Sequence, residues 1–173
     1  MSHRFGDDFP RYLRGLGTLA CIEYVADVAE LEMLRHKAEH AQHAQHARPV
    51  ATPILSRLSG ETLKKLRVRL HPSVCLVQSR FPIVTAWETY RTSGAGVTVE
   101  RWVGEAALVA RPFLKVEVRR LPPGGYAFLR ALSEGQTIGT AAAGRVNDVS
   151  PQFDLASVLE LIEDAKVIIG VHR

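Results

Sequence analysis

Apolar residues recur at steps of three and four along much of the chain, which is the spacing of one face of an α-helix. The longest such stretch predicts a helix over residues 24–47, where Tyr24, Val28, Leu31 and Leu34 form an apolar stripe. That stripe needs a partner surface on which to pack. The same spacing, often with a proline or a polar residue at the start, predicts shorter helices over residues 7–17, 59–66, 82–90, 123–133, 137–143 and 154–166.

The period changes from helical spacing to two after a glycine-bearing stretch at residues 92–96. Alternation then predicts three short antiparallel strands, over residues 97–102, 106–110 and 115–119. We also expect an extended segment near residues 67–78, interrupted at Pro72, and a last buried strand over residues 167–171.

These elements predict an α+β fold in two parts. A mainly helical N-terminal lobe covers residues 1–92, and a second lobe covers residues 97–173. The order of strands and helices in the second lobe, three antiparallel strands followed by three helices, indicates a winged-helix-like arrangement.

Composition narrows the class of protein. The 173 residues are 46% hydrophobic with a mean hydropathy of -0.01, and no long apolar run is present, which argues against a membrane-spanning or wholly disordered chain. Lys and Arg outnumber Asp and Glu by 22 to 18, a surplus too small to indicate nucleic acid by itself. Cys21 and Cys75 are far apart and lie in no CxxC motif, and the N-terminus has no apolar signal segment, so we expect a cytosolic protein with free thiols.

No catalytic motif is visible, so we do not expect an enzyme or a cofactor. Basic residues on or beside the predicted strands are the more informative feature, because a small sheet with an open edge and basic flanks suits an extended acidic peptide. In a DNA-reading winged helix the second helix would carry basic and amide side chains, whereas residues 137–145 end in a single arginine, Arg145. The candidate peptide contacts are Arg101, Lys115 and Arg119.

Histidines gather near the end of the longest predicted helix. On one continuous helix, His36, His40 and His43 would fall within about 60° of one another, so they could share a metal ion or present a pH-sensitive face. Their arc lies opposite the apolar stripe and points to solvent, and a solvated, alanine-rich helix end explains the run equally well. We therefore expect no resident metal and keep these three as weak candidates.

Several fragments match one known family in order and spacing. They read GDDFPRYL at residues 6–13, YVADVAELE at 24–32, RVRLHP at 67–72, FPIVTAW at 81–87, VRRL at 118–121 and YAFLRAL at 126–132. In these fragments the chain resembles the HvfC/BufC-type proteins, which are related to MbnC. The resemblance spans nearly the whole chain, without the helical domain that precedes the first fragment in that family.

The resemblance implies a non-catalytic accessory protein. Proteins of this type bind an iron-dependent enzyme of the HvfB/MbnB type and help to hold its precursor peptide, in the biosynthesis of a modified, copper-binding ribosomal peptide. We accordingly expect an enzyme and a precursor peptide as partners, no membrane, and an interface with the enzyme near Arg67, Arg69 and Trp87. The family also carries a DNA-binding label, so a DNA-binding transcriptional regulator is the alternative.

Overall fold

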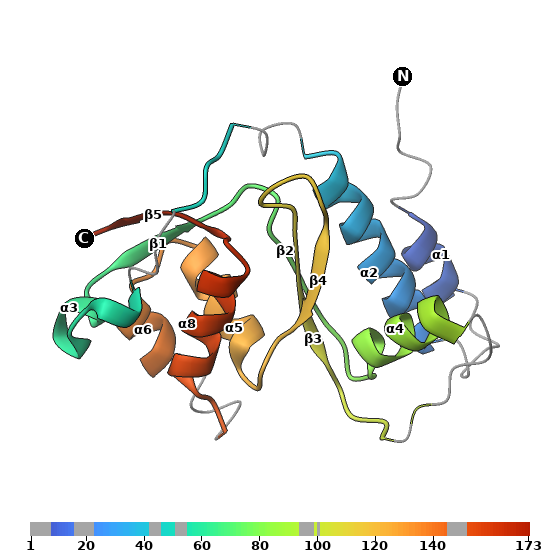
Figure 1. Ribbon diagram of the computed structural model, residues 1–173. Coiled ribbons are helices and arrows are strands. Elements are labelled where there is room, and N and C mark those ends of the chain that lie inside the picture. Colours follow the sequence, from blue (N-terminus) through green and yellow to red (C-terminus); the bar gives the residue numbers. More distant parts are fainter. Residues whose placement is uncertain are drawn as a thin grey trace.

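The structure is a computed structural model that describes residues 8–15, 23–41, 46–50, 55–93, 99, 101–144 and 152–173. Its centre is a three-stranded antiparallel sheet in the order β2-β3-β4. The strands are β2 (Cys75–Gln78), β3 (Ala106–Ala110) and β4 (Glu117–Arg120), and β3 is the middle strand. Figure 1 shows this sheet running through the middle of the molecule between two groups of helices.

One face of the sheet is covered by the C-terminal helices α5 (Gly125–Ser133), α6 (Ile138–Ala143) and α8 (Leu155–Asp164), which share one hydrophobic cluster with it. Leu108 of β3 contributes to this cluster, together with Phe128 and Ile162 from the helices. Each large aliphatic side chain buried there contributes roughly 1.5 to 3 kcal/mol relative to an exposed one. This face is therefore the main core of the protein.

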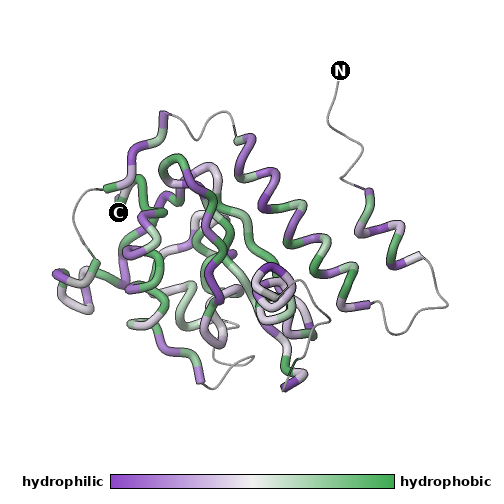
Figure 2. The backbone as a smooth tube through the Cα atoms, turned by 45° about the vertical axis from the view of Figure 1, so that its right-hand side comes forward, coloured by the Kyte–Doolittle hydropathy of each residue, from purple (hydrophilic) through white to green (hydrophobic). Residues whose placement is uncertain are grey.

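The other face is covered by α2 (Glu23–Glu39) and α4 (Ile83–Ser93). Val109, one residue along β3, points to this side because successive side chains of a strand alternate between faces. It packs with Leu31 of α2 and Val84 of α4. Figure 2 shows α2 with alternating hydrophilic and hydrophobic bands, as expected for a helix with one packed face, and α1 (Phe9–Gly15) lies beside it.

A smaller sheet joins distant parts of the chain. β1 (Arg67–Leu70) pairs antiparallel with β5 (Ile168–His172), next to the 3-10 turn η3 (Leu55–Arg57) and α3 (Gly60–Lys64). The close approach of α3 and α6 depends on Gly139, because a Cβ there would lie 2.8 Å from the Lys64 carbonyl oxygen. Both sheets thus pair a strand from before residue 92 with strands from after residue 97.

The structure confirms the α+β class and most of the predicted helices, with small shifts of their ends. The predicted helix over residues 24–47 is helical as far as Glu39, and residues 42–45 lie outside the described residues. The predicted strands at 106–110 and 115–119 correspond to β3 and β4, and the last predicted strand corresponds to β5.

The first of the three predicted antiparallel strands, over residues 97–102, does not supply the third strand of the sheet. Residues 101–105 form no strand, and 97, 98 and 100 lie outside the described residues. Trp102 and Val103 are 56% and 64% exposed, so alternation here creates no buried face. The third strand of the sheet is β2, from the predicted extended segment, and α4 (Ile83–Ser93) lies between β2 and β3 along the chain. Among the described residues, no helix combines the length and apolarity needed to cross a membrane.

Candidate functional site

The outer edge of β4 is the candidate site. In the described part of the chain no strand pairs with β4 on the side away from β3. Just beyond the paired residues, the amide of Leu121 donates to the carbonyl of Ala106 at 2.8 Å. In an antiparallel strand the backbone N–H and C=O groups of every second residue face the neighbouring strand. Those of Arg119, two residues before Leu121, therefore also face β3. The peptide groups of Val118 and Arg120 therefore face outward, where they offer donors and acceptors to an added strand.

A groove of about 650 Å³ runs beside this edge on the α2 and α4 side of the sheet. Residues from α2, α4 and the approach to β4 line it. They are Arg35, Glu39, Trp87, Arg91, Leu114, Lys115, Val116, Glu117, Val118 and Arg119. Four basic residues and two acidic residues thus line the groove together with an aromatic residue and several aliphatic ones.

Trp87 forms the aromatic wall of this groove and is held from two helices. Its Nε1–H donates to Glu32 Oε1 at 2.6 Å, and the guanidinium of Arg91 lies 4.9 Å from the centroid of its indole ring. Arg35 also donates to Glu32, at 2.8 Å. Partial burial by itself would raise the pKa of Glu32, but the hydrogen bonds from Arg35 and Trp87 leave that pKa below its ordinary value.

The position of α4 is fixed by the segment that leads into β3. Glu105 accepts hydrogen bonds from the amides of Val84 and Thr85, at 2.8 and 2.9 Å, which satisfies two amides in the first turn of α4. Arg120 of β4 lies 3.3 Å from the same carboxylate. These contacts tie α4, and with it Trp87, to the edge strand.

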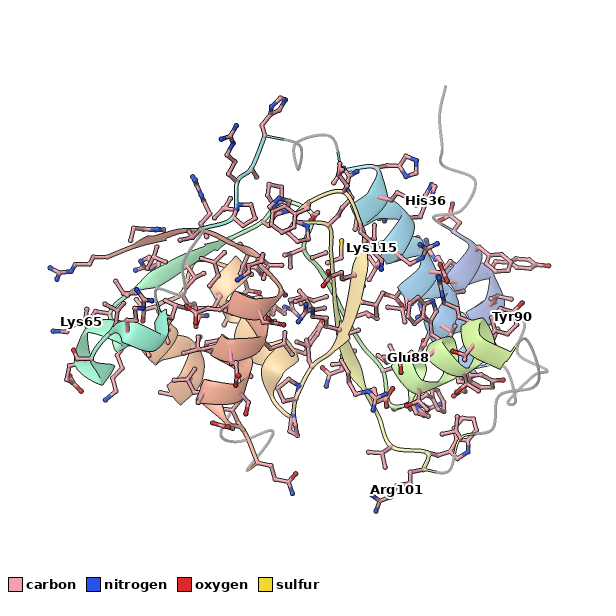
Figure 3. The ribbon with its side chains drawn as sticks, viewed as in Figure 1. His36, Lys65, Glu88, Tyr90, Arg101 and Lys115 are labelled. Carbon is pink, nitrogen blue, oxygen red and sulfur yellow. The ribbon has the colours of Figure 1, made fainter. Side chains whose placement is uncertain are left out.

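The connection from β3 to β4 carries exposed apolar side chains that are followed directly by a lysine. Phe113 is 65% exposed and Leu114 is 94% exposed, and Lys115 follows them directly. In Figure 3, Lys115 lies close to β4 near the middle of the molecule, whereas Lys65 lies at the left-hand end. An incoming chain would meet apolar surface and positive charge at this end of the edge.

The three predicted peptide contacts are not brought together. Arg119 is already engaged, because it donates to Glu117 at 2.9 Å and to Asp164 of α8 at 2.5 Å. The hydrogen bond with Asp164 raises the pKa of Arg119, and the same bond lowers the pKa of Asp164. Arg101 is exposed below α4 and well away from Lys115 (Figure 3). Of these three residues, only Lys115 offers an exposed, unengaged charge beside the edge.

The predicted enzyme contacts are also spread over the molecule. Arg67 and Arg69 are exposed on β1, where Arg67 donates to the carbonyl of Gly135, and Trp87 lies on α4 at the other side of the central sheet (Figure 1). A single small interface cannot include all three.

His36 lies on the last turn of α2 and His40 directly follows its last residue, and Glu39 joins them in a group that the histidine spacing alone did not reveal. His43 lies outside the described residues, as does Cys21. Cys75 is a free thiol whose pKa is raised by burial.

Arg35 and Arg91, which line the groove, were not among the site residues predicted from the sequence. For Arg91 a signal existed, because it lies one helical turn after Trp87.

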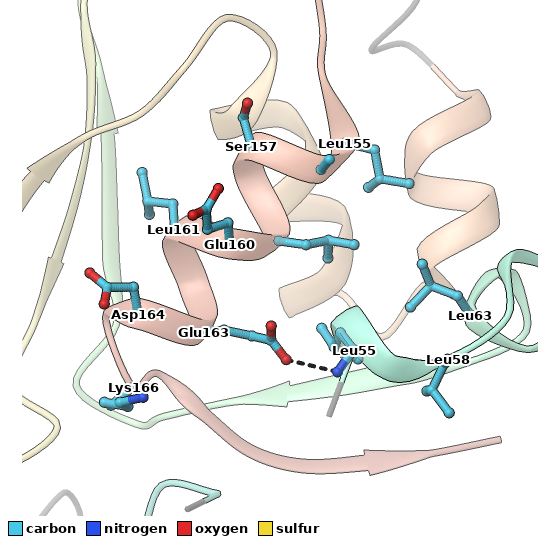
Figure 4. Close-up of a pocket in the computed structure, with 12 residues that line it drawn as sticks. Leu55, Leu58, Leu63, Leu155, Ser157, Glu160, Leu161, Glu163, Asp164 and Lys166 are labelled. Carbon is cyan, nitrogen blue, oxygen red and sulfur yellow. Dashed lines mark hydrogen bonds between the residues drawn. The ribbon is translucent and has the colours of Figure 1, made fainter. Parts of the chain in front are cut away.

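A second hollow of about 1050 Å³ opens beside α8 (Figure 4). Leu55, Leu58 and Leu63 form one wall, and the side chains of α8 form the other. The amide of Leu55 donates to Glu163 at 2.7 Å, which holds η3 against α8. Among the described residues, those that line this hollow belong to helices and turns, and none belongs to a strand of either sheet.

Comparison with protein-family models and with curated proteins found no match to the chain.

Proposed function

We propose that this chain is a non-catalytic accessory protein that binds an extended peptide along the outer edge of β4. The observation that carries the proposal is the combination of outward-facing peptide groups at Val118 and Arg120 with the groove beside them. Main-chain hydrogen bonds to such an edge give affinity, and pockets for alternate side chains give specificity.

The surroundings of the edge favour a particular kind of peptide. Every second side chain of an added strand would lie over the groove, against Trp87 and near Arg91 and Lys115. The intervening side chains would lie toward α8, where Asp164 and Glu117 are already paired with Arg119. We therefore expect a peptide that alternates acidic or apolar residues on the groove side with small polar residues on the other.

The sequence resemblance supplies the biological setting of the proposal. In that setting the bound segment belongs to a precursor peptide, and the chain presents it to an iron-dependent enzyme that modifies it. The test is copurification with an enzyme of that type and comparison of peptide modification with and without this chain. Absence of a complex, together with unchanged modification when the chain is omitted, would contradict the accessory role.

Charge reversal tests the location of the peptide. Lys115→Glu should weaken binding of a fluorescently labelled peptide that alternates glutamate and valine by roughly three- to tenfold, which corresponds to about 1 kcal/mol at a surface site. Lys65→Glu makes the same change in net charge at the far end of the molecule and should leave the affinity unchanged. Equal effects of the two substitutions would contradict a site at β4.

Duplex DNA provides the competing outcome. In the predicted winged helix, the recognition helix would be α6, and none of its residues Ile138–Ala143 is basic. We expect DNA not to compete with the labelled peptide at physiological salt. Steeply salt-dependent DNA binding in place of peptide binding would favour a regulator and contradict the proposal.

A further inference from the structure

The C-terminal end of α2 gathers three side chains that can ligate a metal ion. His36, Glu39 and His40 each offer a ligand atom, and these atoms all lie within 4.8 Å of one another. The spacing follows from helix geometry, because residues three and four apart project from the same face. All three residues are exposed, so an ion from solution can reach them.

We propose that His36, Glu39 and His40 form a binding site for a divalent transition-metal ion of the zinc class. Two imidazole nitrogens and one carboxylate oxygen favour Zn²⁺ or a neighbouring borderline ion over Mg²⁺ or Ca²⁺, which prefer oxygen ligands alone. Three protein ligands leave a coordination position for water or for another ligand.

The arrangement around His40 supports this assignment. Its Nδ1 lies 2.9 Å from the carbonyl oxygen of His36, and because a carbonyl only accepts, Nδ1 must carry the proton. A neutral imidazole in this tautomer has its lone pair on Nε2, the nitrogen that would bind the metal. A backbone carbonyl that orients a ligating histidine in this way is a recurrent part of metal sites.

The local electrostatics also favour a cation. The site lies at the C-terminal end of α2, where the aligned peptide dipoles give the helix end a partial negative charge. The nearby positive charge of Arg35 is balanced by Glu32 at 2.8 Å. The rings of His36 and His40 lie 4.1 Å apart between centroids, so one ion can engage both after small rotamer changes.

Zinc titration of the tag-free full chain, followed by calorimetry, tests the site. We expect one ion per chain, and His36→Gln and His40→Gln should each weaken binding by at least about tenfold, the lower end of what a disturbed metal site loses. Glu39→Gln should also weaken it. His172→Gln is the matched control, because His172 is an exposed histidine at the other end of the molecule, and it should bind zinc as the unaltered chain does.

Cobalt substitution gives a second readout, since the visible absorption bands of Co²⁺ change in position and intensity when protein ligands replace water around the ion. This change should be absent in the double variant His36→Gln/His40→Gln. Unchanged zinc affinity in that variant, or equal loss in His172→Gln, would overturn the site. Because the readout is metal binding by the free chain, this outcome is separate from the test of peptide binding.

Discussion

Trp87 joins two helices through one polar atom. Its indole N–H reaches Glu32 of α2, while the ring packs at the edge of the cluster formed by α2, α4 and the sheet. A hydrogen bond to a charged acceptor contributes more than a neutral one, and loss of the donor leaves the carboxylate with less compensation for its partial burial. The contact therefore sets both the stability of the α2–α4 packing and the orientation of the groove wall.

We expect Trp87→Phe to lower the free energy of unfolding by about 1 to 2 kcal/mol, because the substitution keeps an aromatic ring but removes the donor. Urea denaturation at neutral pH measures this loss. Trp102→Phe is the matched control: Trp102 is exposed and its only described ring contact is with Tyr24, so its effect should be smaller. Equal effects at the two positions would contradict the role of the Glu32 hydrogen bond.

The hydrogen bond between Trp87 and Glu32 also predicts that the free energy of unfolding depends on pH. The pKa of Glu32 is lower in the folded protein than in the unfolded chain, so its contribution is present above the ordinary glutamate value of about 4.3 and is lost as the pH falls through the folded value. The stability difference between the unaltered chain and Trp87→Phe should shrink over that acidic range. Urea denaturation at a series of pH values checks this, and a constant difference would contradict it.

At the scale of elements, α3 and α6 pack closely at one glycine. A Cβ at position 139 would approach both the backbone and the Cβ of Lys64 within 3 Å, so Gly139→Ala must push the two helices apart. We expect a loss of about 1 to 3 kcal/mol in the free energy of unfolding, despite the better helix propensity of alanine. Gly60→Ala, where a Cβ would meet no atom within 4 Å, should be neutral or stabilising. Equal destabilisation at both positions would contradict close packing.

The sequence predicted elements better than their pairing. Helical periodicity located α5 and α8, and alternation located β3, because these signals are local. The pairing of β2 with β3 joins residues about thirty apart and depends on which strand finds a buried face, which no local pattern specifies. The predicted strand at residues 97–102 had the alternation of a strand, yet none of its described residues is buried, and Arg101 and Trp102 are exposed.

The candidate site was predictable only in part. The expectation of an open sheet edge with Lys115 beside it came from strand count and basic flanks, and the structure has both features. The groove could not be predicted, since Arg35, Trp87 and Val118 come from three elements that only tertiary packing brings together. Arg119 illustrates the same limit, because its pairing with Asp164 depends on the position of α8.

At the scale of the whole molecule, the two predicted lobes share both sheets. β1 pairs with β5 and β2 pairs with β3, so strands from each half complete the sheets of the other. We expect a single cooperative unfolding transition, with coincident midpoints by tryptophan fluorescence and by far-UV circular dichroism. Two separated transitions would show that the halves fold independently.

The most direct test of the account concerns the outward amide of Val118. Val118→Pro removes that donor without removing an amide that faces β3, and proline is tolerated in an edge strand at such a position. Val118→Ala is the matched control, because it shortens the side chain and keeps the amide. After the folding of both variants is verified, their affinity for the labelled glutamate–valine peptide is measured. The account predicts that Val118→Ala still binds and that Val118→Pro does not; equal binding by the two variants would contradict strand addition at β4.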